Sequence, residues 1–200
     1  MKNWLLAARL KTLPVAISPV ILGSALAIHD QSFHTFICII TIFTAVLIQV
    51  GTNFANDVYD YQKGSDREDR LGPKRATQSG LIYPQKMKKA MWLTFGLAIC
   101  LGFYLASIGG WPIVLIGLTS IAAGIAYTGG PYPLGYHGFG DLFVFVYFGL
   151  IAVTGTYFLQ VGEVNNLSIW LGSIMGMLAT AILVVNNLRD IDADKLSGKN

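Results

Sequence analysis

Two short clusters of aspartate and asparagine side chains have the spacing of a metal site built on helices. In each cluster an asparagine precedes an aspartate by four residues, and a further aspartate follows after three or four residues. The clusters are Asn53, Asp57 and Asp60, and Asn186, Asp190 and Asp194. Residues spaced by three and four share one face of a helix, so each cluster is predicted to present aligned carboxylates.

Each cluster ends an apolar run and is therefore expected at the carboxyl end of a helix. The helix dipole adds about half a negative charge there, so the carboxylates need a compensating cation. Magnesium accepts one or two carboxylates and completes its shell with water and phosphate oxygens, whereas zinc favours Cys and His ligands. The pattern predicts Mg2+. Its expected ligands are Asp57, Asp60, Asp190 and Asp194, with amide contacts from Asn53 and Asn56.

Basic residues flank both clusters on the side from which an anion would arrive. Arginine can bind phosphate oxygens through two parallel hydrogen bonds, so a phosphate-bearing substrate is predicted. The bases expected to bind it are Lys74, Arg75, Arg189 and Lys195. The alternative for a base is a contact with lipid headgroups, which we favour for Lys86, Lys88 and Lys89.

The composition shows that the elements carrying these side chains are membrane helices. The chain has 200 residues, of which 54% are hydrophobic and 12% charged, whereas soluble domains carry about 25% charged residues. Six runs approach the length of about 20 residues that crosses a bilayer as a helix. They are Leu13 to Ile28, Thr35 to Ala55, Ala90 to Ser107, Trp111 to Thr128, Leu142 to Val161 and Leu167 to Asn187. The predicted fold class is an all-α, polytopic transmembrane bundle.

The first of these runs has two further interpretations. It could begin near Trp4 as an interfacial helix. It could also be a signal peptide, which we disfavour because Pro14 and Pro19 interrupt it and five further spans follow.

The distribution of basic residues predicts the orientation in the membrane. With six spans, all 14 Lys and Arg fall on one side, and the other side carries only Asp30 and Glu163. The positive-inside rule makes the basic side cytoplasmic, together with both termini. We expect a multi-pass protein of a bacterial inner or plasma membrane, with its active site on the cytoplasmic side.

The segment from Tyr127 to Asp141, expected to be a cytoplasmic loop, is rich in glycine, proline and tyrosine. It matches neither of the glycine patterns that bind nucleotide phosphates. A tight, aromatic-lined turn fits it better, and no nucleic-acid partner is expected.

A membrane site with paired carboxylates and bases predicts a substrate with a diphosphate head and a lipid-like tail, a polyprenyl diphosphate. Loss of diphosphate would leave an allylic cation, which aromatic rings can shield by cation-π contact. The candidates for that wall are Tyr104, Tyr127, Phe143, Tyr147 and Phe158. Tyr127, at the end of the fourth span, is the one singled out.

The stretches "NFANDVYDYQKGSD" and "NNLRDIDADK" resemble the paired aspartate motifs of the UbiA superfamily of intramembrane prenyltransferases. "RLKTLPVAISPVILGSALA", "GPKRATQSGLI" and "YTGGPYPLGYHGFGDLFVFVYFG" resemble its branch that prenylates 1,4-dihydroxy-2-naphthoate. The resemblance implies eight or nine helices around a Mg2+-diphosphate cavity. It implies prenyl transfer with loss of CO2 and diphosphate, giving demethylmenaquinone.

Carried over to this sequence, the resemblance implies catalytic roles for Asp57, Asp60, Asp190, Asp194 and Tyr127. It also implies diphosphate contacts from bases that include Arg9. The chain departs from the broad first motif at Gly64, where an aspartate is usual. It also stops at Asn200, so residues 1–200 are expected to form one prenyltransferase domain that is incomplete at its C-terminus.

Two alternative functions remain open from the sequence. One is a sister prenyltransferase that uses 4-hydroxybenzoate, homogentisate or haem as its acceptor. The other is a cation or phosphate transporter. Transporters usually place ionisable groups near the bilayer midplane, and the span interiors here hold nothing more polar than Gln49, Ser and Thr.

Overall fold

The computed structural model of the chain describes residues 1–64 and 75–196, with side chains as far as Ile191. Within these residues every regular element is helical. The α-helices are α1 (Lys2–Ala8), α2 (Leu13–His29), α3 (Thr35–Gln62), α4 (Pro84–Gly109), α5 (Trp111–Ala126), α6 (Gly140–Val144), α7 (Ala152–Val161) and α8 (Asn166–Leu196). Short 3-10 turns are η1 (Leu10–Thr12) and η2 (Leu134–Tyr136), and a π-helical segment, η3 (Phe145–Ile151), joins α6 to α7. The predicted all-α bundle is confirmed.

Within residues 1–64 and 75–196, five helical stretches are long and apolar enough to cross a membrane. They are Lys2–His29, Thr35–Gln62, Pro84–Gly109, Gly140–Val161 and Asn166–Ile191, and the shorter apolar α5 stands among them. The largest differences from the predicted boundaries are at α3, which continues to Gln62 rather than ending at Ala55, and at α8, which continues to Leu196 rather than ending at Asn187. Asp57 and Asp60 therefore lie on the last turns of α3 and are held in fixed directions.

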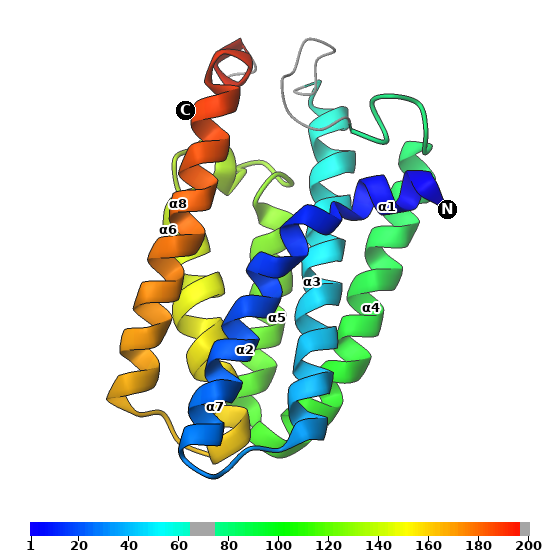
Figure 1. The fold of residues 1–200 in the computed structure, drawn as a ribbon. Coiled ribbons are helices and arrows are strands. Elements are labelled where there is room, and N and C mark those ends of the chain that lie inside the picture. The colour runs from blue at the N-terminus through cyan, green and yellow to red at the C-terminus, as the bar shows by residue number, and fades with distance from the viewer. Residues whose placement is uncertain (65–74, 197–200) are drawn as a thin grey trace.

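The helices stand side by side, and α1 lies across one end of the bundle (Figure 1). The N-terminus and the far end of α8 are both at that end, as is the end of α3 that carries the first acidic cluster (Figure 1). The edge of the Trp4 ring meets Phe54 of α3, with ring centroids 5.8 Å apart. The two acidic motifs are thus brought to one end of the molecule.

The contact between α3 and α4 forms the main core next to that end. Phe54, Val58, Met87, Met91 and Phe95 are all buried there. Close packing also needs Gly51, because a Cβ at this position would lie 2.5 Å from a carbon of the Phe95 ring. This core fixes α3 against α4 below the acidic cluster.

Candidate active site

The end of α3 carries a polar stripe of four residues. At 3.6 residues per turn, Asn53 and Asp60 lie near the centre of the stripe, and Asn56 and Asp57 lie at opposite edges, about 100° apart. The structure uses the two edges differently. Asn56 contacts Thr128, in the loop that follows α5, and Asp57 contacts the loop that leads into α4.

Asp57 anchors this loop through both carboxylate oxygens. The amide of Ala76 donates to Oδ2 at 3.0 Å and that of Thr77 to Oδ1 at 2.8 Å. The Asp57 side chain is 1% exposed. Hydrogen bonds to a charged acceptor in such a buried place are among the stronger ones in proteins. Asp57 therefore holds residues 75–77 against α3, a role that the sequence did not predict.

Asp60 forms a buried ion pair and accepts a further hydrogen bond. Arg75 donates from Nη2 to Asp60 Oδ2 at 2.7 Å, and both side chains are at most 5% exposed. The Tyr136 hydroxyl donates to Oδ1 at 2.9 Å. The structure thus brings Asp60 together with Arg75, a base predicted to bind diphosphate. It adds Tyr136, which the sequence reasoning missed although it lies in the loop noted for its tyrosines.

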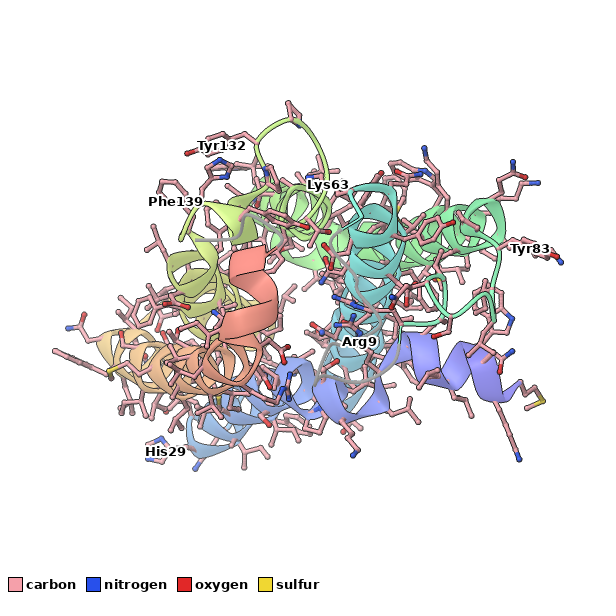
Figure 2. All side chains as sticks on the ribbon, turned by 90° about the horizontal axis from the view of Figure 1, so that it is seen from above. Arg9, His29, Lys63, Tyr83, Tyr132 and Phe139 are labelled. Atoms are coloured by element: carbon pink, nitrogen blue, oxygen red, sulfur yellow. The ribbon has the colours of Figure 1, made fainter. Side chains whose placement is uncertain are left out.

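Lys63 holds the Tyr127 to Asp141 loop over the end of α3. Its Nζ donates to the carbonyl of Gly130 at 3.3 Å and lies 5.0 Å from the centroid of the Tyr136 ring. Seen from above, Lys63 lies beside this loop, and Tyr132 and Phe139 lie at its outer side (Figure 2). The loop is therefore fixed at the same end of the bundle as Asp60.

Asn53 ties α3 to the junction between α1 and α2. Its Nδ2 donates to the carbonyl of Ala8 at 2.9 Å and to Thr12 Oγ1 at 3.0 Å. Arg9, at this junction, has φ of 51°, a left-handed conformation that is uncommon outside glycine. Seen from above, Arg9 lies near the centre of the molecule, between α1 and α3 (Figure 2). Asn53 thus helps to fix the backbone on which Arg9 is carried.

Asn56, at the other edge of the stripe, lines the wall of a cavity together with Tyr127, which directly follows α5. The Thr128 hydroxyl is 2.9 Å from Asn56 Oδ1 and donates to it. The Tyr127 ring is held by two glycines of its loop. A Cβ at Gly135 or at Gly140 would lie 2.9 Å from atoms of the Tyr127 side chain.

The second acidic cluster is described as far as Asp190. Arg189 donates to both Asp190 oxygens, from Nε at 2.9 Å and from Nη2 at 3.0 Å. The Asp190 side chain is 5% exposed and that of Arg189 is 43% exposed. The predicted site residues Lys74, Asp194 and Lys195 have side chains outside the described part of the chain.

The cavity below the polar stripe has a volume of about 510 Å³. Its lining on α3 runs from Thr41 to Asn56, about 22 Å along the helix at 1.5 Å per residue. Apolar side chains of α2, α4, α5, η3 and α7 form most of the remaining wall. A long apolar chain fits a cavity of this shape, with its polar head at the end that carries Asn53 and Asn56.

Three of the five aromatic candidates line this cavity, namely Tyr127, Phe143 and Tyr147. The rings of Phe143 and Tyr147 stack with centroids 5.9 Å apart. Tyr104 instead meets the edge of Phe36, and Phe158 packs against the core cluster around Leu105 and Leu159.

The profile of the UbiA prenyltransferase family matches residues 16–200. The chain belongs to this family. It is 40% identical to the 1,4-dihydroxy-2-naphthoate octaprenyltransferase of Haemophilus influenzae, over 100% of this chain and 68% of that protein. The octaprenyltransferase of the same name from Escherichia coli is also 40% identical, over 98% and 66%. The UbiA prenyltransferase domain-containing protein 1 of Mus musculus is 30% identical, over 98% and 59%. The chain spans about two thirds of the length of the two bacterial relatives.

For a UbiA-family site, the described residues provide oxygen ligands of the kind that Mg2+ prefers. They include the carboxylates of Asp60 and Asp190 and the amide oxygen of Asn56. No group of three or more His, Cys, Asp or Glu side chains gathers within the described residues. Mg2+ needs only one or two carboxylates when phosphate and water complete its shell, so these residues fit the ion.

Proposed function

We propose that the protein transfers a polyprenyl group from polyprenyl diphosphate to 1,4-dihydroxy-2-naphthoate, with loss of CO2 and diphosphate, giving demethylmenaquinol, the reduced form of demethylmenaquinone. The observation that carries the proposal is that the polar end of α3 adjoins a long apolar cavity. Asn53 and Asn56 line one end of a largely apolar cavity that runs about 22 Å along α3. The buried pair of Asp60 and Arg75 lies about one turn further along the same helix. The similarity to bacterial 1,4-dihydroxy-2-naphthoate octaprenyltransferases supports this choice of acceptor.

The two acidic clusters are proposed to hold the diphosphate together with Mg2+. Asp60 and Asn56 would supply oxygen ligands from α3, and Asp190 and Asp194 would supply them from α8. When bound, Mg2+ neutralises the negative charge that develops on the departing diphosphate. The proposed diphosphate-binding bases are Arg9, Lys74, Arg75, Arg189 and Lys195.

Two of these arginines contact aspartates in the structure. Arg75 is paired with Asp60, and Arg189 is paired with Asp190. Each pair offers a guanidinium that can bind phosphate oxygens while remaining next to the carboxylates. Before the substrate binds, each aspartate compensates the positive charge of its arginine. After it binds, the arginines hold the diphosphate leaving group.

The reaction itself is proposed to occur where the polar end meets the cavity. The bond between the allylic carbon and the diphosphate oxygen breaks, and the carbon of the acceptor that bears the carboxylate forms the new bond with loss of CO2. Tyr127, Phe143 and Tyr147 line the cavity. Their rings would exclude water and stabilise the allylic cation.

Both substrates are proposed to approach from the cytoplasmic side and the membrane. The basic side of the chain and both termini would then be cytoplasmic, in a bacterial inner or plasma membrane.

The test is a product assay with the purified protein in lipid. One polyprenyl diphosphate and Mg2+ are supplied with 1,4-dihydroxy-2-naphthoate, 4-hydroxybenzoate or homogentisate. The proposal expects the naphthoate to have the highest kcat/KM and its product to lack the carboxyl group. A higher kcat/KM with either of the other acids would assign the protein to a sister activity.

A further inference from the structure

A second polar site lies deeper in the cavity, around Gln49. This side chain is half-buried on the cavity wall, one turn of α3 before Asn53. Its Nε2 is 3.2 Å from Thr12 Oγ1 and 3.4 Å from Asn53 Oδ1. Such an amide among apolar neighbours is costly unless both of its ends find partners.

The direction of each hydrogen bond in this network follows from two backbone carbonyls, which can only accept. Thr12 gives its one hydroxyl hydrogen to the carbonyl of Arg9 at 2.9 Å, so its oxygen accepts from both amides. Asn53 gives one hydrogen of Nδ2 to the carbonyl of Ala8 and the other to Thr12. Asn53 Oδ1 is therefore the acceptor, and the atom of Gln49 that faces it must be the nitrogen.

The network leaves the carbonyl end of Gln49 as the available group. Both hydrogens of Nε2 are used on Thr12 and Asn53. Among the described residues, Gln49 Oε1 accepts no hydrogen bond. This oxygen is not fully buried, and Gln49 lines the cavity, so Oε1 is accessible from the cavity. The cavity thus presents one oriented acceptor at this depth.

We infer that Gln49 Oε1 binds a phenolic hydroxyl group of the aromatic acceptor. The inference rests on the proposed function. A polyprenyl chain has no hydrogen to donate, and the carboxylate of the acceptor would be repelled by a carbonyl oxygen, which leaves the hydroxyl as the matching group. Gln49 lies seven residues before Asn56, about 10 Å along the helix. A two-ring acceptor can therefore reach from Gln49 toward the diphosphate end.

The test compares wild type with Gln49→Met, which keeps the size of the side chain and removes its hydrogen-bonding groups. Binding of 1,4-dihydroxy-2-naphthoate is followed by its own fluorescence, without prenyl diphosphate. We expect Kd for the acceptor to rise about tenfold, the effect of one lost hydrogen bond. The KM for polyprenyl diphosphate is expected to stay unchanged.

The hydroxyl involved is identified with 1-hydroxy-2-naphthoate and 4-hydroxy-2-naphthoate. The analogue that lacks the bound hydroxyl should bind wild type about tenfold more weakly and should not distinguish wild type from Gln49→Met. This coupling is the mark of a direct contact. If both analogues lose the same factor in Gln49→Met as the natural acceptor does, the direct contact is refuted.

Gln160→Met is the matched control. Gln160 bonds with both ends of its amide to the backbone of His34, outside the cavity, so its substitution should leave the Kd of the acceptor unchanged. If Gln49→Met also leaves this Kd unchanged, the inference is wrong even though the naphthoate is still prenylated. If wild type binds and prenylates only another ring acid, the proposed function is wrong.

Discussion

The two aspartates at the end of α3 differ in what they contact, although they are three residues apart. Asp57 accepts hydrogen bonds from the backbone amides of Ala76 and Thr77. Asp60 accepts hydrogen bonds from the side chains of Arg75 and Tyr136. We interpret Asp57 as a positioning residue that holds Arg75 against Asp60. Asp60 is the better candidate for direct contact with the diphosphate site.

Asp57→Asn tests this division of roles. The variant keeps one acceptor oxygen but turns an amide NH2 toward a backbone N–H, so the free energy of unfolding should fall by about 1–3 kcal/mol. Trypsin should cleave after Arg75 more readily. The KM for polyprenyl diphosphate should rise, with no change in the Mg2+ concentration that gives half-maximal rate.

Asp60→Asn is the matched comparison for this prediction. It should lower kcat at least a hundredfold and raise the Mg2+ concentration needed for half-maximal rate. If Asp57→Asn shifts the Mg2+ requirement as strongly as Asp60→Asn does, Asp57 is a metal ligand and the positioning role is wrong.

Tyr136→Phe removes the hydroxyl that donates to Asp60 and leaves the ring beside Lys63. Loss of one charge-assisted hydrogen bond should lower kcat/KM for the prenyl donor about tenfold. Tyr132→Phe is the control, because Tyr132 is exposed and stacks on His137. Equal rates for Tyr136→Phe and wild type would exclude Tyr136 from the site.

Residue types and spacings were enough to predict the acidic clusters, but the partners of their side chains were not predictable. Asp60 meets Arg75 and Tyr136 at separations of 15 and 76 residues. Contacts over such distances depend on how loops fold back, and helical periodicity contains no information about that. The different contacts of Asp57 and Asp60 were not predicted for this reason.

At the scale of elements, the predicted spans correspond to helices, and the differences lie at their ends. The second span was predicted to end at Ala55, because charged residues begin just after it, whereas α3 continues to Gln62. Polar residues can extend a helix beyond the apolar run when neighbouring loops satisfy them, as residues 75–77 satisfy Asp57. The π-helical segment Phe145–Ile151 had no sequence signal that we recognised.

Contact between η3 and α8 depends on glycine. A Cβ at Gly149 would lie 2.4 Å from the Cα of Gly176 and 2.5 Å from the carbonyl oxygen of Gly172. These are backbone atoms, so Gly149→Ala should force the helices apart and cost about 1–3 kcal/mol. The melting temperature in detergent should fall.

Gly96→Ala in α4 is the control for this prediction, because nothing lies within 4 Å of a Cβ there. Alanine in the interior of a helix should stabilise the protein by about 0.5–1 kcal/mol relative to glycine. Equal melting temperatures for the two alanine variants would contradict the close packing of η3 on α8.

The opposite end of the bundle is joined by a hydrogen bond from the Tyr157 hydroxyl to Asp30 Oδ2, at 2.5 Å. This bond, with a further one to His29, lowers the pKa of Asp30 below its ordinary value of 3.8. A carboxylate whose pKa is lowered by folding stabilises the protein above its unfolded pKa, and that stability is lost as the pH falls through the folded pKa.

Tyr157→Phe should therefore lower the melting temperature near neutral pH. The difference from wild type should shrink as the pH falls below about 3.8. A melting-temperature difference that does not change with pH would show that the ionised form of Asp30 adds nothing to stability.

At the scale of the whole molecule, the bundle brings both acidic motifs to the end where the N-terminus lies (Figure 1). The even alternation of spans predicted this arrangement, since an even number of crossings returns the chain to its starting side. The orientation of the bundle in the membrane remains a prediction from the positive-inside rule.

Cysteine labelling in intact cells tests the orientation. In a background without Cys38 and Cys100, a membrane-impermeant maleimide should label Glu163→Cys but should reach Lys88→Cys only after permeabilisation. Both positions are exposed. The reverse labelling pattern would place the active-site end outside the cytoplasm.

The proposed mechanism requires α3 and α8 to act together on one prenyl diphosphate. Its most direct test is the rate of demethylmenaquinol formation, followed by mass spectrometry, for wild type, Asp60→Asn and Asp190→Asn. We predict a Mg2+-dependent product that carries the prenyl group and lacks the carboxyl group, with at least a hundredfold loss of rate in each variant. Full activity in either variant, or a product that retains the carboxyl group, would contradict the proposed mechanism.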